Sequence, residues 1–341
     1  MTIGWGIVST GRHPDTKMAP AITAAEGASL AAVMSRDMGR AEAFAQKHGS
    51  ASAYDDVDAL LRDPAVDVVY IASPNALHAE QTVRAAEAGK HVLVEKPMAL
   101  SVDDAQRMID ACEAAGVRLG VGFHLRAHEG HQRLRTLVAD GALGRVSFAH
   151  ADWCRGVRGQ EAPPPREGLQ AWWDDPSLIG AGAFMATGVH CADLLRYVLD
   201  DDVAEVSAVS DATPEKPLEE LVTLSLRFKS GVIATLLTGR RTPDYERNDV
   251  NVYGTLGRAG LNASIDMNQA GALAVRTDAL TEDEAYAPHP FELYTKQVQA
   301  FDAAVEGNGA PLATGLDGLR VVEITLAMVE SARTGARVSL G

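Results

Sequence analysis

A lysine stands at the end of a short hydrophobic segment, where a charged side chain is unexpected. The stretch KHVLVEKPMAL (90–100) is mostly apolar from His91 to Val94, after which Glu95, Lys96 and Pro97 end the pattern. In open α/β sheets, ligands bind at the carboxyl ends of the strands. An ammonium group there can donate a proton to a substrate carbonyl, provided that burial or a nearby positive charge lowers its pKa from about 10.4. Consecutive strand residues point to opposite faces, so we expect Glu95 and Lys96 to face different ways. The alternative is a lysine that only solubilises the strand end.

A histidine follows a glycine-rich run and forms the second candidate for proton chemistry. In GAGAFMATGVHCAD (180–193), Gly180 and Gly182 allow close backbone approach, and His190 then opens a helical pattern at 189–199. An imidazole can donate or accept a proton near neutral pH. A lone histidine can equally be a packed core residue, and the residues alone leave both interpretations open.

The first third of the chain must position Lys96, and it alternates between strand and helix patterns. Strands are expected at 3–8, 29–34, 68–71, 91–94 and 118–122, and helices at 18–26, 38–48, 77–88 and 102–115. Such alternation predicts a doubly wound parallel sheet with helices on both faces. Gly89 and Gly116 come just after helical patterns, where left-handed caps are favoured.

The pattern changes after about residue 123. A helix at 128–140 is followed by strand patterns at 146–154, 203–210, 221–228 and 232–238, and helices are expected at 291–305 and 316–334. Consecutive strands, two of them joined by the short turn KSG, predict a mostly antiparallel sheet. We therefore expect an α/β protein with a Rossmann domain (1–123) and an α+β domain (124–341) with a large open sheet. The C-terminal helix could pack back on the first domain.

Composition excludes several classes of partner. The chain has 341 residues and a net charge of −15, which argues against nucleic acid and anionic membranes. No run of about 18 apolar residues predicts a membrane helix, and no signal peptide is evident. The three cysteines have no C-x-x-C spacing and indicate reduced thiols in a cytoplasmic protein. The segment APPPREG (162–168) is typical of a surface loop.

The loop after the first strand resembles a dinucleotide site with one substitution. In GWGIVSTGRHP, the positions of the G-x-G-x-x-G/A motif are held by Ser9, Gly11 and Pro14. Ser9 can still form a tight turn, and the hydroxyls of Ser9 and Thr10 could bond a phosphate. An ordinary strand-to-helix turn is the alternative.

The end of the second strand favours NADP over NAD. An acid normally follows that strand when the ribose carries a free 2′-hydroxyl. Here Ser35 and Arg36 follow it, with Arg40 close behind, and a hydroxyl and guanidinium groups suit a 2′-phosphate. We expect Asp37 to start the next helix instead. A solvated, charged helix start remains the other interpretation.

The segment SPNALHAEQTVRAAEAGKHVLVEKPMAL (73–100) resembles the signature of the Gfo/Idh/MocA oxidoreductases. The resemblance runs nearly full length, through WGIVSTGR, GVGFHLR, GAGAFMATGVHCAD and ATGLDGLRVVEI. Within the family, the Ser35 strand tip, HLR (124–126), LRYVLDDD (195–202) and FKSGVIA (228–234) resemble the NADPH-dependent 1,5-anhydro-D-fructose reductases.

This resemblance implies an NADP(H)-dependent oxidoreductase that transfers a hydride to or from a sugar, anhydrosugar or polyol. It implies a homo-oligomer, dimer or tetramer, and catalytic roles for Lys96 and His190. With the residues above, the implied cofactor-binding residues are Ser9, Thr10, Gly11, Arg12, Ser35, Arg36, Arg40, Ser73, Pro74, Asn75, His78, Glu95, Lys96, Pro97, Arg126, Trp172 and Tyr294. The implied substrate-binding residues are Lys96, His124, Trp173, Thr187 and His190. The Lys96–Pro97 bond is often cis in such proteins.

Two positions depart from the family pattern. Trp173 stands where an arginine is expected, and Ala186 stands where an aspartate usually precedes the histidine by four residues. Three interpretations of Ala186 remain: Lys96 and His190 act alone, another group substitutes for the aspartate, or the protein binds cofactor without catalysis and serves as a regulator. The candidate substitutes are His124, Thr187, Asp174 and Asp175. The alternative to substrate contact for His124 is hydrogen bonding between the domains. For Trp173 the alternative is core packing.

No metal site is expected. His128 and His131 are three residues apart, whereas a zinc-binding helix uses a spacing of four. The identity of the sugar or polyol and the physiological direction of the reaction do not follow from the residues.

Overall fold

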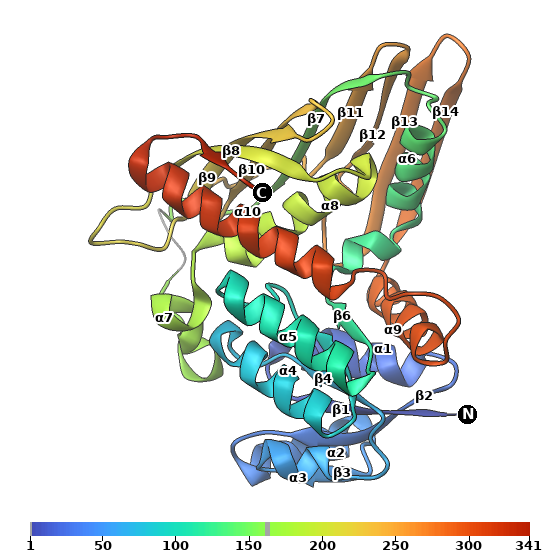
Figure 1. The fold of residues 1–341 in the computed structure, drawn as a ribbon, viewed down its shortest axis with the longest axis vertical. Coiled ribbons are helices and arrows are strands. Elements are labelled where there is room, and N and C mark those ends of the chain that lie inside the picture. Colours follow the sequence, from blue (N-terminus) through green and yellow to red (C-terminus); the bar gives the residue numbers. More distant parts are fainter. Residues whose placement is uncertain (1, 161–163) are drawn as a thin grey trace. The chain divides into compact units, whose positions relative to one another are not determined.

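The structure is a computed structural model that describes residues 2–160 and 164–341, drawn in Figure 1. The chain forms two compact units. The first comprises Met1–His124, Glu167–Trp173 and Pro290–Val322, and the second comprises Leu125–Arg166, Asp174–His289 and Glu323–Gly341. Residues 162 and 163 of the expected APPPREG loop lie outside the described residues. The boundary at residue 123 stays a prediction.

The first unit contains a six-stranded parallel sheet in the order β3-β2-β1-β4-β5-β6. Its strands are β1 (Ile3–Val8), β2 (Ala28–Met34), β3 (Ser52–Tyr54), β4 (Val68–Ile71), β5 (His91–Val94) and β6 (Leu119–Val121). Its helices are α1 (Ala19–Ala24), α2 (Met38–His48), α3 (Val57–Leu61), α4 (His78–Glu87), α5 (Val102–Ala115) and α9 (Glu292–Val305). The expected doubly wound fold is confirmed, because this strand order is that of a dinucleotide-binding sheet whose order reverses between β1 and β4.

Local signals explain where the helices of this unit begin and end. The side chains of Asp37, Asp56 and Ser101 each accept the backbone N–H three residues ahead, capping α2, α3 and α5. Asp37 is therefore the helix start that the sequence predicts. Gly116 ends α5 at φ 69°, and Gly89 lies at φ 73°, so both expected left-handed glycines are confirmed.

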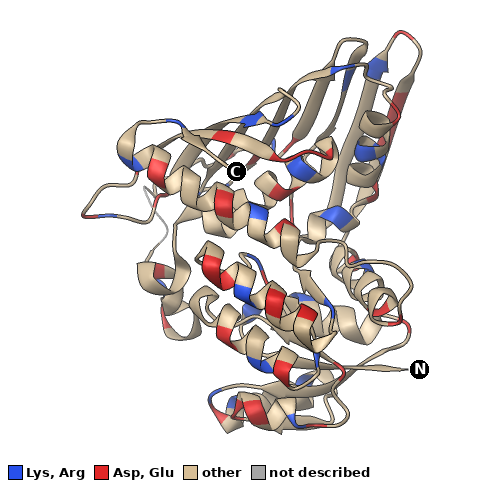
Figure 2. Ribbon diagram, viewed as in Figure 1, with Lys and Arg blue, Asp and Glu red and all other residues tan. Residues whose placement is uncertain are grey.

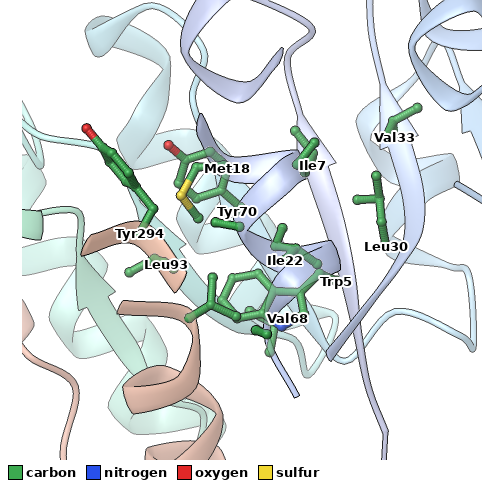
Figure 3. Close-up of a cluster of buried hydrophobic side chains, with 14 of the residues drawn as sticks. Trp5, Ile7, Met18, Ile22, Leu30, Val33, Val68, Tyr70, Leu93 and Tyr294 are labelled. Carbon is green, nitrogen blue, oxygen red and sulfur yellow. The ribbon is translucent and has the colours of Figure 1, made fainter. Parts of the chain in front are cut away.

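The core of this unit joins the sheet to α9. Six consecutive buried residues form β1, as expected of a central strand covered on both faces. Figure 3 shows Trp5, Ile7, Val68, Tyr70 and Leu93 from the sheet together with Tyr294 from α9. The hydroxyl ends of the two tyrosines lie away from the indole of Trp5 in this view. Helix α9, which comes far later in the chain than the strands of this sheet, thus completes the core of the first unit.

The second unit is built on a nine-stranded sheet in the order β14-β13-β12-β11-β7-β10-β9-β8-β15. Its strands are β7 (Val146–Cys154), β8 (Val203–Ser210), β9 (Leu221–Phe228), β10 (Ile233–Gly239), β11 (Val250–Gly254), β12 (Gly257–Asn262), β13 (Gln269–Thr277), β14 (Thr281–His289) and β15 (Val338–Ser339). Only β10 and β7 pair in parallel among these strands, so the mostly antiparallel expectation is confirmed.

Helices α6 (Glu129–Ala139) and α8 (Val189–Leu199) contact this sheet, and the short helix α7 (Pro176–Ile179) lies between them in the chain. The expected helix at 189–199 is confirmed at its bounds, with Leu194, Leu195 and Val198 fully buried. The last helix, α10 (Gly315–Thr334), begins in the first unit and ends in the second. Figure 2 shows acidic residues interspersed with basic ones along α4, α5 and α10.

Several elements differ from the sequence prediction. The helix expected at 18–26 is a π-helical turn, Pro14–Met18, followed by the short α1. The strand expected at 118–122 is shorter, and the sequence did not predict β3, α3, α7, β11–β14 or β15. One described helical stretch, Pro176–Leu199, is long and apolar enough to span a membrane by length and composition alone. Since 89% of its apolar window is buried, it is a core element of the second unit.

Candidate active site

The loop after β1 makes a tight turn at a serine. Ser9 has φ 105°, a conformation that favours glycine, and its backbone N–H donates to the carbonyl of Met34. Its hydroxyl accepts the N–H of Gly11 at 3.3 Å. The serine therefore occupies the turn position that glycine holds in the dinucleotide motif, with Thr10 and Arg12 following it on the same loop.

The end of β2 presents the residues expected to choose the cofactor. Ser35 is buried, and the Nε of Arg40 donates to its hydroxyl at 3.4 Å. Arg36 is exposed beside it. The carboxylate of Asp37 accepts the N–H of Arg40 at 2.8 Å and so serves as a helix cap.

The loop after β4 is joined to the loop after β5 by a buried histidine. His78 Nδ1 lies 2.9 Å from the carbonyl oxygen of Pro97, and Nε2 lies 2.9 Å from that of Ser73. Burial lowers the pKa of His78, and a neutral imidazole carries one N–H, so it bonds one of these carbonyls at a time. The hydroxyl of Ser73 donates to Gln81 at 2.6 Å, and Asn75 is buried nearby in the chain. His78 thus lies between the carbonyls of Ser73 and Pro97 and can donate to either one.

Lys96 lies beyond the end of its strand, which corrects one step of the sequence argument. Because β5 ends at Val94, the alternation of side chains along a strand does not apply to Glu95 and Lys96. Instead the Glu95 carboxylate accepts the backbone N–H of Lys96 at 3.3 Å. The Lys96–Pro97 peptide bond is cis, as the family resemblance implies.

Glu95 is held as a carboxylate by groups that the sequence did not indicate. Tyr70 donates its hydroxyl to Glu95 Oε1 at 2.5 Å, and His13 Nε2 lies 3.3 Å from the same oxygen. Burial alone would raise the pKa of Glu95, but His13, Lys96 and Tyr70 lower it to about 2. Glu95 therefore stays ionised at any working pH and cannot be the proton donor of a reaction.

Two aromatic rings flank Tyr294 at the start of α9. The ring of His124 stacks on it with centroids 4.7 Å apart, and the ring of His13 meets it edge-on at 5.2 Å. Tyr294 is 1% exposed, and His124 is also buried. Both residues have a packing role within the first unit, and their cofactor and substrate contacts stay predictions. The rings of Trp172 and Trp173 lie tilted against each other with centroids 4.6 Å apart, and both residues are half-buried.

In the second unit, His190 lies one residue inside α8 and is 3% exposed. Its ring lies 5.1 Å from that of Trp153. The hydroxyl of Thr187 lies 2.5 Å from that of Thr238 and 3.1 Å from the carbonyl of Ala183, while Thr238 donates to the carbonyl of Trp153. Thr187 is thus engaged within the unit, which weakens its candidacy as a substitute for the missing aspartate.

The other candidate substitutes also have partners of their own. Asp174 accepts the guanidinium and backbone N–H of Arg166, and Asp175 caps α7 by accepting from Ser177. Ala186 itself is buried. Both aspartates are therefore engaged locally, and the role of Ala186 stays a prediction.

Arg126 forms a buried ion pair in the second unit. Its Nε and Nη2 donate to the two oxygens of Asp193 on α8 at 2.9 and 2.6 Å, and its guanidinium lies over the ring of Tyr197. The two side chains are 6% and 2% exposed. The pair anchors α8, and a cofactor contact of Arg126 stays a prediction.

The residues described in 2–160 and 164–341 include no cluster of three or more His, Cys, Asp or Glu side chains suited to a metal ion. His128 Nε2 lies 2.8 Å from the carbonyl of Ala270, and His131 lies 3.0 Å from Ser264 Oγ. Both histidines of the H-E-G-H segment are therefore explained by packing.

The residues of the first unit suit a nicotinamide dinucleotide. Ser9, Ser35, Ser73 and Lys96 each follow the carboxyl end of a different strand of one parallel sheet. Ser9 and Ser73 lie on either side of the point where the strand order reverses, which is where such sheets bind dinucleotides. Ser9 and Thr10 offer hydroxyls to a diphosphate, and Ser35, Arg36 and Arg40 offer donors to a 2′-phosphate.

Comparisons with known proteins agree with this arrangement. Residues 3–123 match the family model described as "Oxidoreductase family, NAD-binding Rossmann fold" (GFO_IDH_MocA), and residues 131–260 match the "GFO/IDH/MocA C-terminal domain". A 1,5-anhydro-D-fructose reductase of Ensifer adhaerens is 35% identical over 97% of this chain and 96% of its own. A D-xylose 1-dehydrogenase (NADP(+)) of Haloferax volcanii is 32% identical over 98% and 99%. The crystal structure of an aldose-aldose oxidoreductase from Caulobacter crescentus, complexed with glycerol, superposes with a TM-score of 0.88 at 27% identity, covering 100% of both chains.

Proposed function

The chain belongs to the Gfo/Idh/MocA oxidoreductase family, and on that premise we propose that it uses NADP(H) to interconvert a carbonyl and a secondary alcohol on a sugar, anhydrosugar or polyol. Its relatives are named sugar and polyol dehydrogenases and reductases, so it is an NAD(P)-dependent oxidoreductase acting on CH–OH groups. The preference for NADP and the substrate class are the proposal. The observation that carries it is the set of hydroxyl and cationic side chains at the carboxyl edge of the parallel sheet.

The residues that follow β2 support NADP. Ser35 stands at the strand end where an acid would bind the ribose hydroxyls. The nearby Asp37 does not replace that acid, because its carboxylate caps α2. Ser35 and Arg40 contact each other there, and Arg36 is exposed. A 2′-phosphate would gain charge-assisted hydrogen bonds from these donors, whereas a 2′-hydroxyl has no carboxylate to bond. The relative from Haloferax volcanii carries NADP(+) in its name.

The bound cofactor would supply or accept the hydride. Lys96 would hold the proton for the substrate oxygen, since it is the cationic side chain at the end of β5. The neighbouring Glu95 carboxylate cannot compete as an acid, because its pKa is held at about 2. His190 would move the proton onward, an ordinary role for an imidazole near neutral pH.

Substitution of Lys96 tests the mechanism directly. Lys96→Met keeps the length of the side chain and removes the ammonium, so kcat should fall by a factor of about 10² or more while NADPH affinity stays within a few-fold. Lys90→Met is the matched control, since Lys90 lies at the other end of β5 and bonds the carbonyls of Asp63 and Val66. A Lys96→Met enzyme with near-normal kcat would exclude this assignment.

A panel of keto-sugars and polyols tests the substrate class. NADPH oxidation and NADP reduction would be followed with each compound, and NADPH binding would be measured by its fluorescence. Turnover with at least one sugar-like compound is expected. Cofactor binding without turnover on any of them would favour the non-catalytic regulator instead.

We also propose a homo-oligomer in the cytoplasm. Because side chains alternate along a strand, one face of the second sheet carries the buried residues Ala208, Ala234 and Val252. The other face carries their neighbours Val209, Ile233 and Tyr253, which are 72%, 38% and 37% exposed. Covering such apolar side chains with a second copy of the chain is favourable. Light scattering should give the mass of a dimer or tetramer, and a monomer at micromolar concentration would refute the proposal.

A further inference from the structure

One buried carboxylate holds the glycine-rich run that leads to His190. The N–H groups of Gly182 and Phe184 donate to Glu219 Oε2 and Oε1, each at 2.8 Å. Between them, the N–H of Ala183 donates to the backbone carbonyl of Glu219 at 2.7 Å. Three consecutive backbone donors therefore converge on a single residue that is 3% exposed. Two of these donors bind the Glu219 carboxylate and the third binds its backbone carbonyl, so one buried residue holds the whole run.

The close approach explains the glycine at position 182. A Cβ atom on Gly182 would lie 2.0 Å from the Glu219 carbonyl oxygen and 2.6 Å from its nitrogen. Both are backbone atoms of the segment that leads into β9, so no side chain could rotate away. Only glycine permits this contact.

The anchored residues continue directly into the helix that carries His190. Phe184 opens the π-helical turn Phe184–Gly188, and α8 follows without a break. A second tie lies at Thr187, whose hydroxyl meets that of Thr238 at 2.5 Å on β10. The first turns of this helical segment are thus fixed to the sheet at two points, both buried.

We propose that Glu219 is a positioning residue for His190, acting through the backbone of residues 182–184. The inference rests on the proposed function in that His190 handles the proton of the reaction. Since Ala186 replaces the carboxylate expected four residues before His190, the position of the imidazole depends on how this backbone is held.

Ionised glutamate suits this task better than its amide. A carboxylate accepts from two N–H groups and carries no donor, whereas glutamine would direct an NH2 group at one of them. Burial raises the pKa of Glu219, and the N–H groups of Phe184 and Gly182 together with Arg240 oppose that rise. Replacing Glu219 with glutamine should therefore release one of the two side-chain contacts and leave the backbone contact in place.

The test compares Glu219→Gln with Glu220→Gln. Glu220 is the adjacent residue, is also buried, and pairs with Arg240 rather than with the glycine run. Three measurements are made on each full-length variant: kcat with an accepted substrate, NADPH affinity by fluorescence, and hydrogen exchange at the amides of residues 182–184.

Glu219→Gln should raise exchange at 182–184 and lower kcat by a factor of about 10 to 100, because a misplacement of about 1 Å can cost as much. NADPH affinity should stay within twofold. Glu220→Gln should leave both kcat and the exchange of these amides unchanged. The proposal is overturned if Glu219→Gln keeps kcat within twofold, if exchange at 182–184 does not rise, or if both variants lose kcat alike.

A readout without turnover separates this inference from the proposed function. The C2–H NMR signal of His190, assigned through its loss in His190→Gln, should shift in Glu219→Gln and stay in place in Glu220→Gln. If no substrate is turned over, this signal alone decides the inference: a shift supports it and an unmoved signal overturns it. Should Glu219→Gln fail to fold, Glu219→Asp keeps the charge on a shorter side chain and should give a smaller change in the same direction.

Discussion

Asp302 is a buried acid whose ionisation should oppose folding. It lies on α9 and is 8% exposed, and its Oδ1 accepts the indole N–H of Trp5 at 3.0 Å. Burial raises the pKa of Asp302 from 3.8 to about 7, against the lowering effect of the Trp5 hydrogen bond, and Glu306 adds to the rise. We expect Asp302→Asn to stabilise the protein at alkaline pH, since the amide oxygen can still accept from Trp5.

The size of the effect follows from linkage between protonation and folding. Below about pH 4, Asp302 is protonated in both folded and unfolded chains, and its ionisation costs nothing. As the pH rises from about 4 to 7, only the unfolded chain ionises, so wild-type stability falls by up to about 1.4 kcal/mol per pH unit. Above pH 7 the cost is constant. Its upper limit is about 4 kcal/mol, since each unit of the pKa shift corresponds to about 1.4 kcal/mol.

Urea denaturation at pH 4, 6 and 8 provides the assay. The difference in unfolding free energy between Asp302→Asn and wild type should grow with pH and level off near pH 8. Asp55→Asn is the control, since Asp55 is exposed in the same unit. A difference that is constant across pH, or that appears equally in the control, would refute the argument that buried charge sets it.

Three further substitutions test other contacts. Tyr70→Phe should cost about 1.5–3 kcal/mol in urea denaturation, because the fully buried hydroxyl of Tyr70 is lost as a donor to the Glu95 carboxylate, while Tyr54→Phe, at a half-buried tyrosine whose hydroxyl donates to Asp63 at 3.0 Å, should cost about 1 kcal/mol; equal costs would contradict this ranking. Ser35→Asp should weaken NADPH binding at least about tenfold relative to NADH in fluorescence titrations, because the new carboxylate repels a 2′-phosphate, and an unchanged ratio would remove the case for NADP. Arg126→Met should destabilise the protein by about 3–5 kcal/mol by leaving Asp193 buried and unpaired, whereas Arg133→Met, at the more exposed pair with Glu282, should cost under about 1 kcal/mol; calorimetry that ranks them otherwise would count against the buried pair as an anchor.

Local patterns were sufficient for the parallel sheet and failed for part of the second. The strands β1, β4 and β5 are continuous apolar runs, which are visible in the sequence because both their faces are buried. The edge strand β14 contains Glu282, Asp283 and Glu284 and shows no such pattern. Its place comes from pairing with β13, a relation between segments that propensity does not encode.

The residues of the candidate site likewise fall into those that local sequence patterns indicated and those that only the fold brought together. Lys96, His190 and the loop residues stand out because glycines, hydroxyls and charges interrupt apolar runs at strand ends. The groups that hold them were missed: Tyr70 and His13 meet Glu95 from 25 and 82 residues away in the chain, and Glu219 is 35 residues from Phe184. Gly182 was the one visible signal of the Glu219 contact.

The sequence by itself determined the family, the doubly wound domain, the caps at Asp37, Gly89 and Gly116 and the identity of the residues at the strand ends, because these depend on short-range patterns and on motifs of fixed spacing. Only the tertiary structure decided that Glu95 is a partly buried, ionised partner of Tyr70 and His13, that the strand ends before Lys96, and that Glu219 binds the backbone ahead of His190. A buried polar group must find a partner wherever the fold brings one, and that partner is chosen by proximity in space rather than by distance along the chain.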